Sequence, residues 1–166
     1  MSTRSEVGTA TGVAAGHMKT DINPALKALE VLAGAWTMEL SNGSFLPDPA
    51  ATIRGKASFD WFEGGDFLIM RQGTKKGGVP WATWFIGRDD DSAHYTVCYI
   101  DDRRVSRVYS MSFENGEWKI WRDAPGFSQR FVGKFDKERK IITGYWEKSV
   151  DGKKCEHDVD LTYTRE

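Results

Sequence analysis

The sequence predicts an all-β protein, a closed antiparallel up-and-down β-barrel of about 8–10 strands with a short N-terminal helix. Two observations and one physical argument predict this fold. From about residue 34 to residue 165, short segments alternate apolar and polar residues, as strands with one buried face do. Gly, Asp and Asn turns separate the segments, and connections this short join antiparallel neighbours. Closure into a barrel removes the exposed edges that so many strands would leave.

Length and composition fit one domain of this kind. The chain has 166 residues, 17 of them Gly, and a net charge of −1. This balance predicts no nucleic-acid partner and no membrane partner. No apolar segment is long enough for a signal sequence or a membrane span, so we expect a cytoplasmic protein. Residues 1–22 are predicted to be a disordered tail or a segment left from cloning, and residues 23–166 the barrel domain.

A short helix is predicted at the start of the domain. Asn23 and Pro24 begin it, because proline suits the first helical turn. Leu26, Leu29 and Leu32 then form one apolar stripe. A helix this short is unstable alone in water, so we expect it to pack across one end of the barrel.

Turn residues delimit ten strands. Asn115-Gly116 and Asp151-Gly152 are strong turn signals, because both pairs tolerate the positive φ of a two-residue hairpin turn. Short connections of this kind predict a meander in sequence order. The predicted strands cover residues 35–41, 52–62, 66–73, 79–88, 93–100, 104–113, 117–123, 127–136, 140–149 and 154–165.

Alternation within each strand assigns side chains to the barrel interior or to its outer face. Tyr109 belongs to the more apolar set of its strand and takes Arg107 inward with it. The same rule takes His157 inward in the last strand. The strands between residues 66 and 100 are apolar on both faces, so their aromatic residues stay unassigned. The inward side chains that could contact a ligand are Trp61, Arg107, Tyr109, Arg122, Gln129, Phe131, His157 and Tyr163.

The chain resembles the calycin superfamily of lipocalins and fatty-acid-binding proteins at two positions. Gly34-Ala35-Trp36 comes directly after the predicted helix, and Arg165 lies on the last strand. In those families a tryptophan and a late basic residue pack together at the closed end of the barrel, and Trp36 and Arg165 match these two positions. Cation–π attraction supplies a physical reason for the pairing. The chain is also similar to uncharacterised bacterial lipocalin-like proteins over about residues 25–166, through segments 62–68, 86–89 and 161–165. These resemblances imply the barrel fold and name no ligand.

The leading hypothesis is that the barrel binds a small hydrophobic or amphipathic ligand, possibly an acid, inside its cavity. An unpaired guanidinium inside a barrel is costly, and a bound carboxylate or enolate would offset the cost for Arg107. The alternatives are an internal Asp or Glu partner, or a strand register shifted by one residue, which would turn Arg107 outward. Ligand pockets combine many apolar contacts with few polar ones. Trp61, Tyr109, Phe131 and Tyr163 would supply the walls, and Arg107, Gln129 and His157 would orient the polar head.

Two alternatives use the same cavity. A cofactor-independent cyclase or isomerase would fold a flexible substrate there, with Tyr109 or His157 as the acid. A similarity to nitrobindin, a ten-stranded haem barrel whose iron is held by a late histidine, implies haem bound through His157. The glycine-rich opening motif of nitrobindins is absent from this chain. Apart from this haem we expect no cofactor and no metal, and a homodimer is left open.

Overall fold

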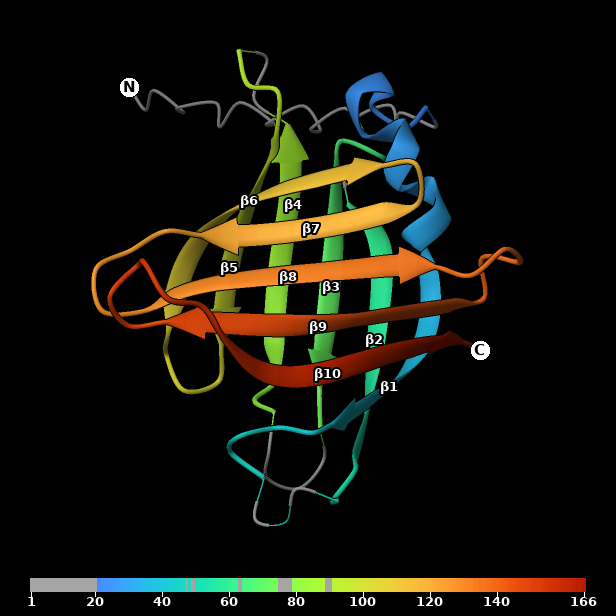
Figure 1. Ribbon diagram of the computed structural model, residues 1–166. Coiled ribbons are helices and arrows are strands. Elements are labelled where there is room, and N and C mark those ends of the chain that lie inside the picture. The colour runs from blue at the N-terminus through green and yellow to red at the C-terminus, as the bar shows by residue number, and fades with distance from the viewer. Residues whose placement is uncertain (1–20, 47, 49, 63, 75–78, 89–90) are drawn as a thin grey trace, which may run out of the picture.

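Figure 1 shows a computed structural model, which describes residues 21–166 except 47, 49, 63, 75–78 and 89–90. Within these residues the chain forms one 3₁₀ helix, η1, and ten strands. The helix is Pro24–Leu32, and the strands are β1 Gly34–Ser41, β2 Ile53–Phe62, β3 Phe67–Gly73, β4 Ala82–Arg88, β5 Tyr95–Asp101, β6 Ser106–Glu114, β7 Glu117–Arg122, β8 Ser128–Phe135, β9 Ile141–Ser149 and β10 Glu156–Arg165. The tail predicted at residues 1–22 lies outside the described residues, apart from Asp21 and Ile22, and stays a prediction.

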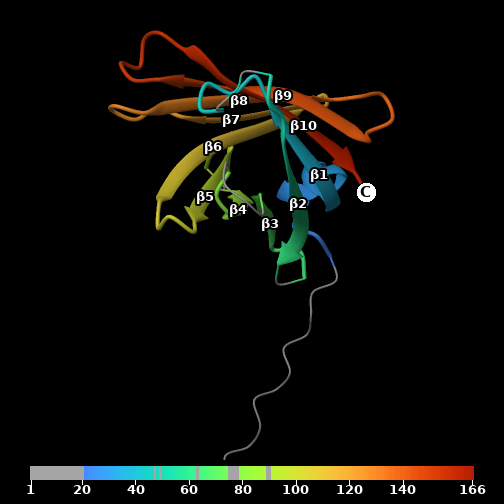
Figure 2. The same ribbon diagram turned by 90° about the horizontal axis from the view of Figure 1, so that it is seen from below.

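The strands form a closed barrel in sequence order. Each strand pairs antiparallel with the next, and β1 pairs with β10 to close the ring. In Figure 1 strands β6–β10 lie in front and cross strands β2–β5 behind them. Figure 2 shows from below that β1 and β2 join these two layers on one side and β6 joins them on the other. The predicted fold class, with its meander and its short N-terminal helix, is confirmed.

The helix η1 plugs one end of the barrel through a single row of leucines. A 3₁₀ helix has three residues per turn, so Leu26, Leu29 and Leu32 stand directly above one another. All three are fully buried within the barrel core. The backbone N–H of Asn23 donates to the carbonyl of Gly65 (3.0 Å), which ties the start of the helix to the β2–β3 turn. The leucine spacing that the sequence shows is therefore the spacing of this helix type.

The middle of the barrel is filled by aromatic rings. Trp118 packs edge-on against Phe131, with ring centroids 5.1 Å apart, and 6.0 Å from Tyr163. Phe131 lies across two glycines that face each other on β8 and β9, where a Cβ on Gly144 would come within 2.9 Å of its ring. The space between these rings has no room for a water molecule. The hollow expected in the middle is thus occupied by side chains, and open space lies nearer an end of the barrel.

Strand alternation assigns most faces correctly. Tyr109 is buried, whereas its neighbour Val108 is 61 % exposed, as predicted for β6. The strands that were apolar on both faces are resolved by the structure, which buries Trp84 and Tyr99 and leaves Trp81 exposed. The sequence shows no difference between these faces, because the outer face of β4 also carries apolar residues.

Candidate functional site

The two ends of the barrel differ. At one end η1 closes the barrel, and Arg165 holds the end of this helix by donating to the carbonyls of Val31 and Ala33. The opposite end, where β1 ends and β10 begins, is the mouth. A cavity of about 380 Å³ opens there. This volume falls in the range of small-molecule sites.

The mouth cavity combines apolar walls with a few polar side chains. Trp84 and Trp146 form its aromatic floor. The same two rings also border the filled middle of the barrel. Phe45 in the β1–β2 loop and Phe127 in the β7–β8 loop stand at its rim. The polar residues that line it are Gln72, Arg103, Arg107, Gln129 and Asp158.

Two residues predicted from the sequence, Arg107 and Gln129, line this cavity, and a third, Tyr109, is hydrogen-bonded to both. Arg107 Nη1 donates to Gln129 Oε1 (3.0 Å) and to the Tyr109 hydroxyl (3.5 Å). The Tyr109 hydroxyl in turn donates to the same Gln129 oxygen (2.6 Å). Arg107 and Tyr109 are neighbours on the inner face of β6, and Gln129 reaches them from β8. The strand alternation brings them together as predicted.

The positive charge of Arg107 is not neutralised by the described residues. No described carboxylate forms an ion pair with it, and its Nε and Nη2 donate to no described residue. Its guanidinium lies over the ring of Phe127, 4.8 Å from the centroid. A guanidinium has five N–H donors in a rigid fork. Arg107 therefore presents a half-buried positive charge and free donors beside the cavity.

Arg122, also predicted as a ligand contact, holds the β7–β8 loop. Its Nη1 donates to the carbonyl of Phe127 (2.7 Å). Ser128 closes the same loop by exchanging hydrogen bonds with the backbone of Ala124. Arg122 does not line the mouth cavity, but it helps to place the Phe127 ring against Arg107.

A second arginine at the mouth is neutralised. The carboxylate of Asp101 is fully buried, and it accepts hydrogen bonds from Arg103 Nη2 (2.6 Å), the Tyr99 hydroxyl (2.5 Å) and the backbone N–H of Val105 (3.2 Å). Burial alone would raise the pKa of Asp101, but these hydrogen bonds outweigh it and hold the pKa well below its usual range. Burial and the neighbouring carboxylate raise the pKa of Tyr99. Of the two arginines that line the mouth cavity, Arg107 is thus the one that no described carboxylate neutralises.

The predicted inward orientation of His157 is wrong. A β-bulge interrupts β10 between His157 and Val159, and an extra residue at a bulge reverses the alternation of the residues before it. His157 lies on the outer face, where its Nε2 hydrogen-bonds to Asp160 Oδ1 (2.8 Å) and its ring stacks near Tyr145. Neither His157 nor His94, the histidines in the described part of the chain, lines the mouth cavity. The residues present there do not fit haem ligation through His157.

Asp158 takes the inward place that His157 was predicted to occupy. Its carboxylate lines the mouth cavity and pairs with Lys148 Nζ (2.8 Å). Ser44 Oγ donates to the same oxygen (3.1 Å). This pair adds no net charge to the cavity. The sequence carries no signal of the bulge, so alternation alone could not find Asp158.

The remaining predicted site residues lie away from the mouth. Phe131 and Tyr163 belong to the filled middle, where the Tyr163 hydroxyl donates to Gln72 Oε1 (2.6 Å) and burial raises the pKa of Tyr163. Trp61 lies near the end of β2 that adjoins η1. The floor residues Trp84 and Trp146 were missed, because Trp84 belongs to a strand that is apolar on both faces.

Comparisons with known proteins show the fold alone. No family model matches the chain, and no curated protein matches it. Among solved structures, the crystal structure of Rv2717c from M. tuberculosis is similar, with a TM-score of 0.63 and 14% sequence identity over 88% of this chain and 99% of that chain. Among the described residues, no helix has the length and hydropathy to cross a membrane. The same residues contain no group of three or more His, Cys, Asp or Glu placed to hold a metal ion.

Proposed function

We propose that the protein binds a small amphipathic acid at the mouth of the barrel. The observation that supports this function is the half-buried guanidinium of Arg107, which pairs with no described carboxylate and lines a cavity of about 380 Å³. Removing a charge from water is costly unless an opposite charge or several hydrogen bonds replace the water. A ligand carboxylate would provide both, because it matches the fork of an arginine.

The neighbours of Arg107 suit the rest of such a ligand. Gln129 and Tyr109 hold the guanidinium from one side, so its remaining donors are oriented before a ligand arrives. The apolar part of the acid would lie on Trp84 and Trp146, which form the cavity floor. Since the barrel is solid below these rings, the ligand would lie across the mouth and not along the barrel axis.

The contact between Trp36 and Arg165 supports a place for the chain among the calycins. The two residues pack together at the closed end, as the resemblance implies. Barrels of that superfamily bind small molecules, which agrees with a site at the open end. The cytoplasmic location and the homodimer stay predictions.

Binding of decanoate tests the mouth site. We expect Arg107→Met to lower the affinity about tenfold or more, since a hydrogen-bonded charge pair contributes roughly 1.5–3 kcal/mol. Arg130→Met is the matched control, because Arg130 is exposed on the outer face of β8. Isothermal titration calorimetry gives both affinities, and decanol shows whether the carboxylate is recognised. Equal affinity of the wild type and Arg107→Met for decanoate would exclude Arg107 as the anchor.

An enzyme that uses the same site is the second candidate. Of the two acids predicted for a cyclase or isomerase, Tyr109 adjoins Arg107 and His157 lies outside the barrel. Such an enzyme would therefore depend on the Tyr109 hydroxyl. Turnover of a bound acid that falls in Tyr109→Phe while the acid still binds would favour catalysis over simple binding.

A further inference from the structure

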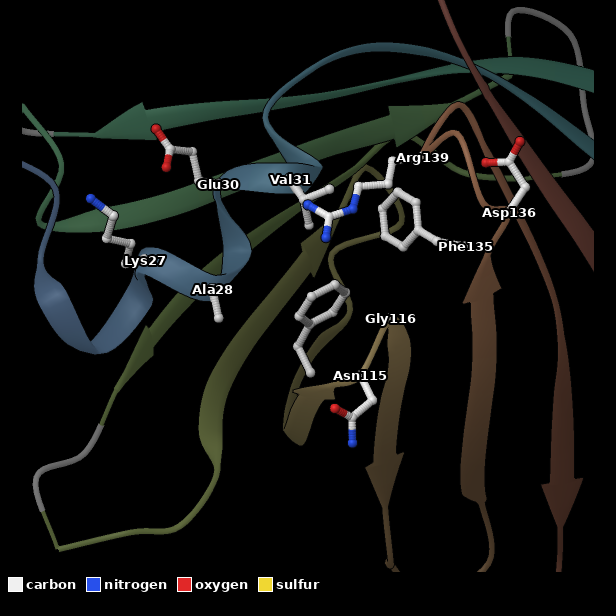
Figure 3. A pocket seen from close by; sticks show the side chains of 10 residues that line it. Lys27, Ala28, Glu30, Val31, Asn115, Gly116, Phe135, Asp136 and Arg139 are labelled. Atoms are coloured by element: carbon white, nitrogen blue, oxygen red, sulfur yellow. The ribbon is translucent and has the colours of Figure 1, made fainter.

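A second pocket lies outside the barrel at its closed end (Figure 3). It lies between η1, the β6–β7 hairpin and the β8–β9 turn, and it measures about 750 Å³. The mouth site uses none of its residues. The pocket is lined by Lys27, Ala28, Glu30, Val31, Phe113, Asn115, Gly116, Phe135, Asp136 and Arg139.

The helix presents an aliphatic ridge to this pocket. With three residues per turn, η1 has three straight ridges, of which the leucines form the buried one. Ala28 and Val31 form the second ridge and face the pocket in Figure 3. Lys27 and Glu30 form the third, and both side chains point away from the aromatic residues of the pocket.

Two phenylalanines form the opposite wall. Phe113 and Phe135 are half-buried and pack edge to face, with ring centroids 5.9 Å apart. Trp36 supports Phe135 from inside the barrel at 6.1 Å. This wall is therefore an extension of the packed core that stays partly open to solvent.

Arg139 extends its guanidinium over this wall. Figure 3 shows it between Val31 and Phe135. No described residue forms an ion pair or a side-chain hydrogen bond with this guanidinium. The carboxylate of Asp136 lines the same pocket, and its Oδ1 accepts from the backbone N–H groups of Ile141 (3.0 Å) and Lys140 (2.8 Å). These hydrogen bonds lower its pKa, so it keeps its negative charge, but it forms no ion pair with Arg139. Arg139 is exposed to solvent and pairs with no described carboxylate, although Glu30 and Asp136 also line the pocket.

The backbone of Arg139 disfavours a side chain. Its φ of 58° lies in the left-handed region, which glycine adopts without strain and other residues adopt at a cost. Arg139 occupies this position at the end of the β8–β9 turn, where a glycine would suit the backbone better.

We infer that this pocket is a second binding site, specific for an amphipathic organic anion. The anionic group would meet Arg139, and a flat apolar body would lie between Phe113, Phe135 and the ridge of Ala28 and Val31. Arginine forms paired hydrogen bonds with carboxylate, sulfonate or phosphate oxygens, and aromatic walls favour flat apolar groups. The site is independent of the mouth, because it uses a different arginine at the other end of the barrel.

The fluorescent sulfonate 1-anilinonaphthalene-8-sulfonate is a suitable probe, with Arg139→Gly as the test variant. Arg104→Gly is a matched control, because Arg104 also has a positive φ, of 67°, and lies in a turn that does not line this pocket. Both variants remove one positive charge and relieve the same kind of backbone strain. We expect the melting temperature of neither to fall. Only Arg139→Gly should lower the affinity of the closed-end site for the probe, by about tenfold or more.

The Arg107→Met variant separates the two sites. Titrated with the probe, the Arg107→Met variant should bind one equivalent. The double variant that carries Arg107→Met and Arg139→Gly should lose this equivalent. The Ala28 methyl resonance reports the location, since it should shift with probe in Arg104→Gly and stay unshifted in Arg139→Gly. Equal binding to Arg139→Gly and Arg104→Gly, or an Ala28 signal that ignores the probe in the wild type, would overturn the inference. Neither result bears on the mouth site.

Discussion

The guanidinium carbon of Arg165 lies 4.1 Å from the centroid of the Trp36 ring, and together these two side chains satisfy the end of η1. Arg165 Nη1 donates to the carbonyl of Ala33 (2.8 Å), and Nη2 donates to that of Val31. Trp36 Nε1 donates to the carbonyl of Leu32 between them (2.8 Å). A helix end leaves carbonyls like these unpaired. The pair therefore fastens the plug to the first and last strands of the barrel.

We expect Arg165→Met to lower the free energy of unfolding by about 3 kcal/mol. The substitution removes a cation–π contact and the donors to two carbonyls, and hydrogen bonds to a charged donor contribute roughly 1.5–3 kcal/mol. Arg165→Lys should recover only part of this loss, because an ammonium lacks the planar fork. Urea unfolding measures both. Thr164→Ala is the control on the exposed neighbour, and a loss of the same size there would contradict the specific role of Arg165.

The stability of the protein should depend on pH through Asp101. Its pKa is lowered in the folded state, so its contribution is complete above the unfolded pKa of about 3.9 and is lost as the pH falls through the folded pKa. We expect Asp101→Asn to cost about 2 kcal/mol at pH 7, from the weakened hydrogen bonds to Arg103 and Tyr99. Urea unfolding between pH 7 and pH 2.5 should show the two proteins converging below about pH 4. A difference that stays constant over this range would show that ionisation of Asp101 is irrelevant.

Gly144 should not tolerate a side chain. A Cβ there would lie 2.4 Å from the carbonyl oxygen of Val132 and 2.9 Å from the Phe131 ring. Overpacking of a tight core costs about 1–3 kcal/mol, and backbone atoms cannot move aside as a flexible side chain can. We expect Gly144→Ala to lose about 3 kcal/mol in thermal or urea unfolding. Gly87→Ala is the matched strand control, since its Cβ would meet only the Phe67 ring at 3.1 Å, and it should lose much less.

His157 should take no part in binding at the mouth. Its ring lies on the outer face of β10 and contacts Asp160 and Tyr145. We expect His157→Ala to keep the decanoate affinity within about twofold. Added hemin should give the same absorption spectrum with the variant as with the wild type. A Soret band that is present in the wild type and lost in His157→Ala would show that the histidine ligates haem, against its place in the structure.

Alternation predicted which side chains point inward better than it predicted where the barrel is hollow. Arg107, Tyr109 and Gln129 meet because their strands are regular, so each inward position follows from counting residues in twos. His157 and Asp158 exchange faces because a bulge shifts the inward–outward alternation by one residue. The sequence of β10 contains no residue pattern that predicts this bulge.

The sequence by itself determined the strands, their order, the helix at one end and the pairing of Trp36 with Arg165. The strands, their order and the helix depend on local patterns, namely alternation, turn residues and an i, i+3 leucine repeat. The pairing of Trp36 with Arg165 was implied by the resemblance to the calycins. Only the tertiary structure decided how deep the cavity is and which charge stays unpaired within the described chain. The depth depends on how rings such as Trp118, Phe131 and Tyr163 interlock, and they come from strands far apart in the sequence. Which arginine stays unpaired depends on which carboxylates lie close to it in the folded barrel. Those distances cannot be read from positions along the sequence.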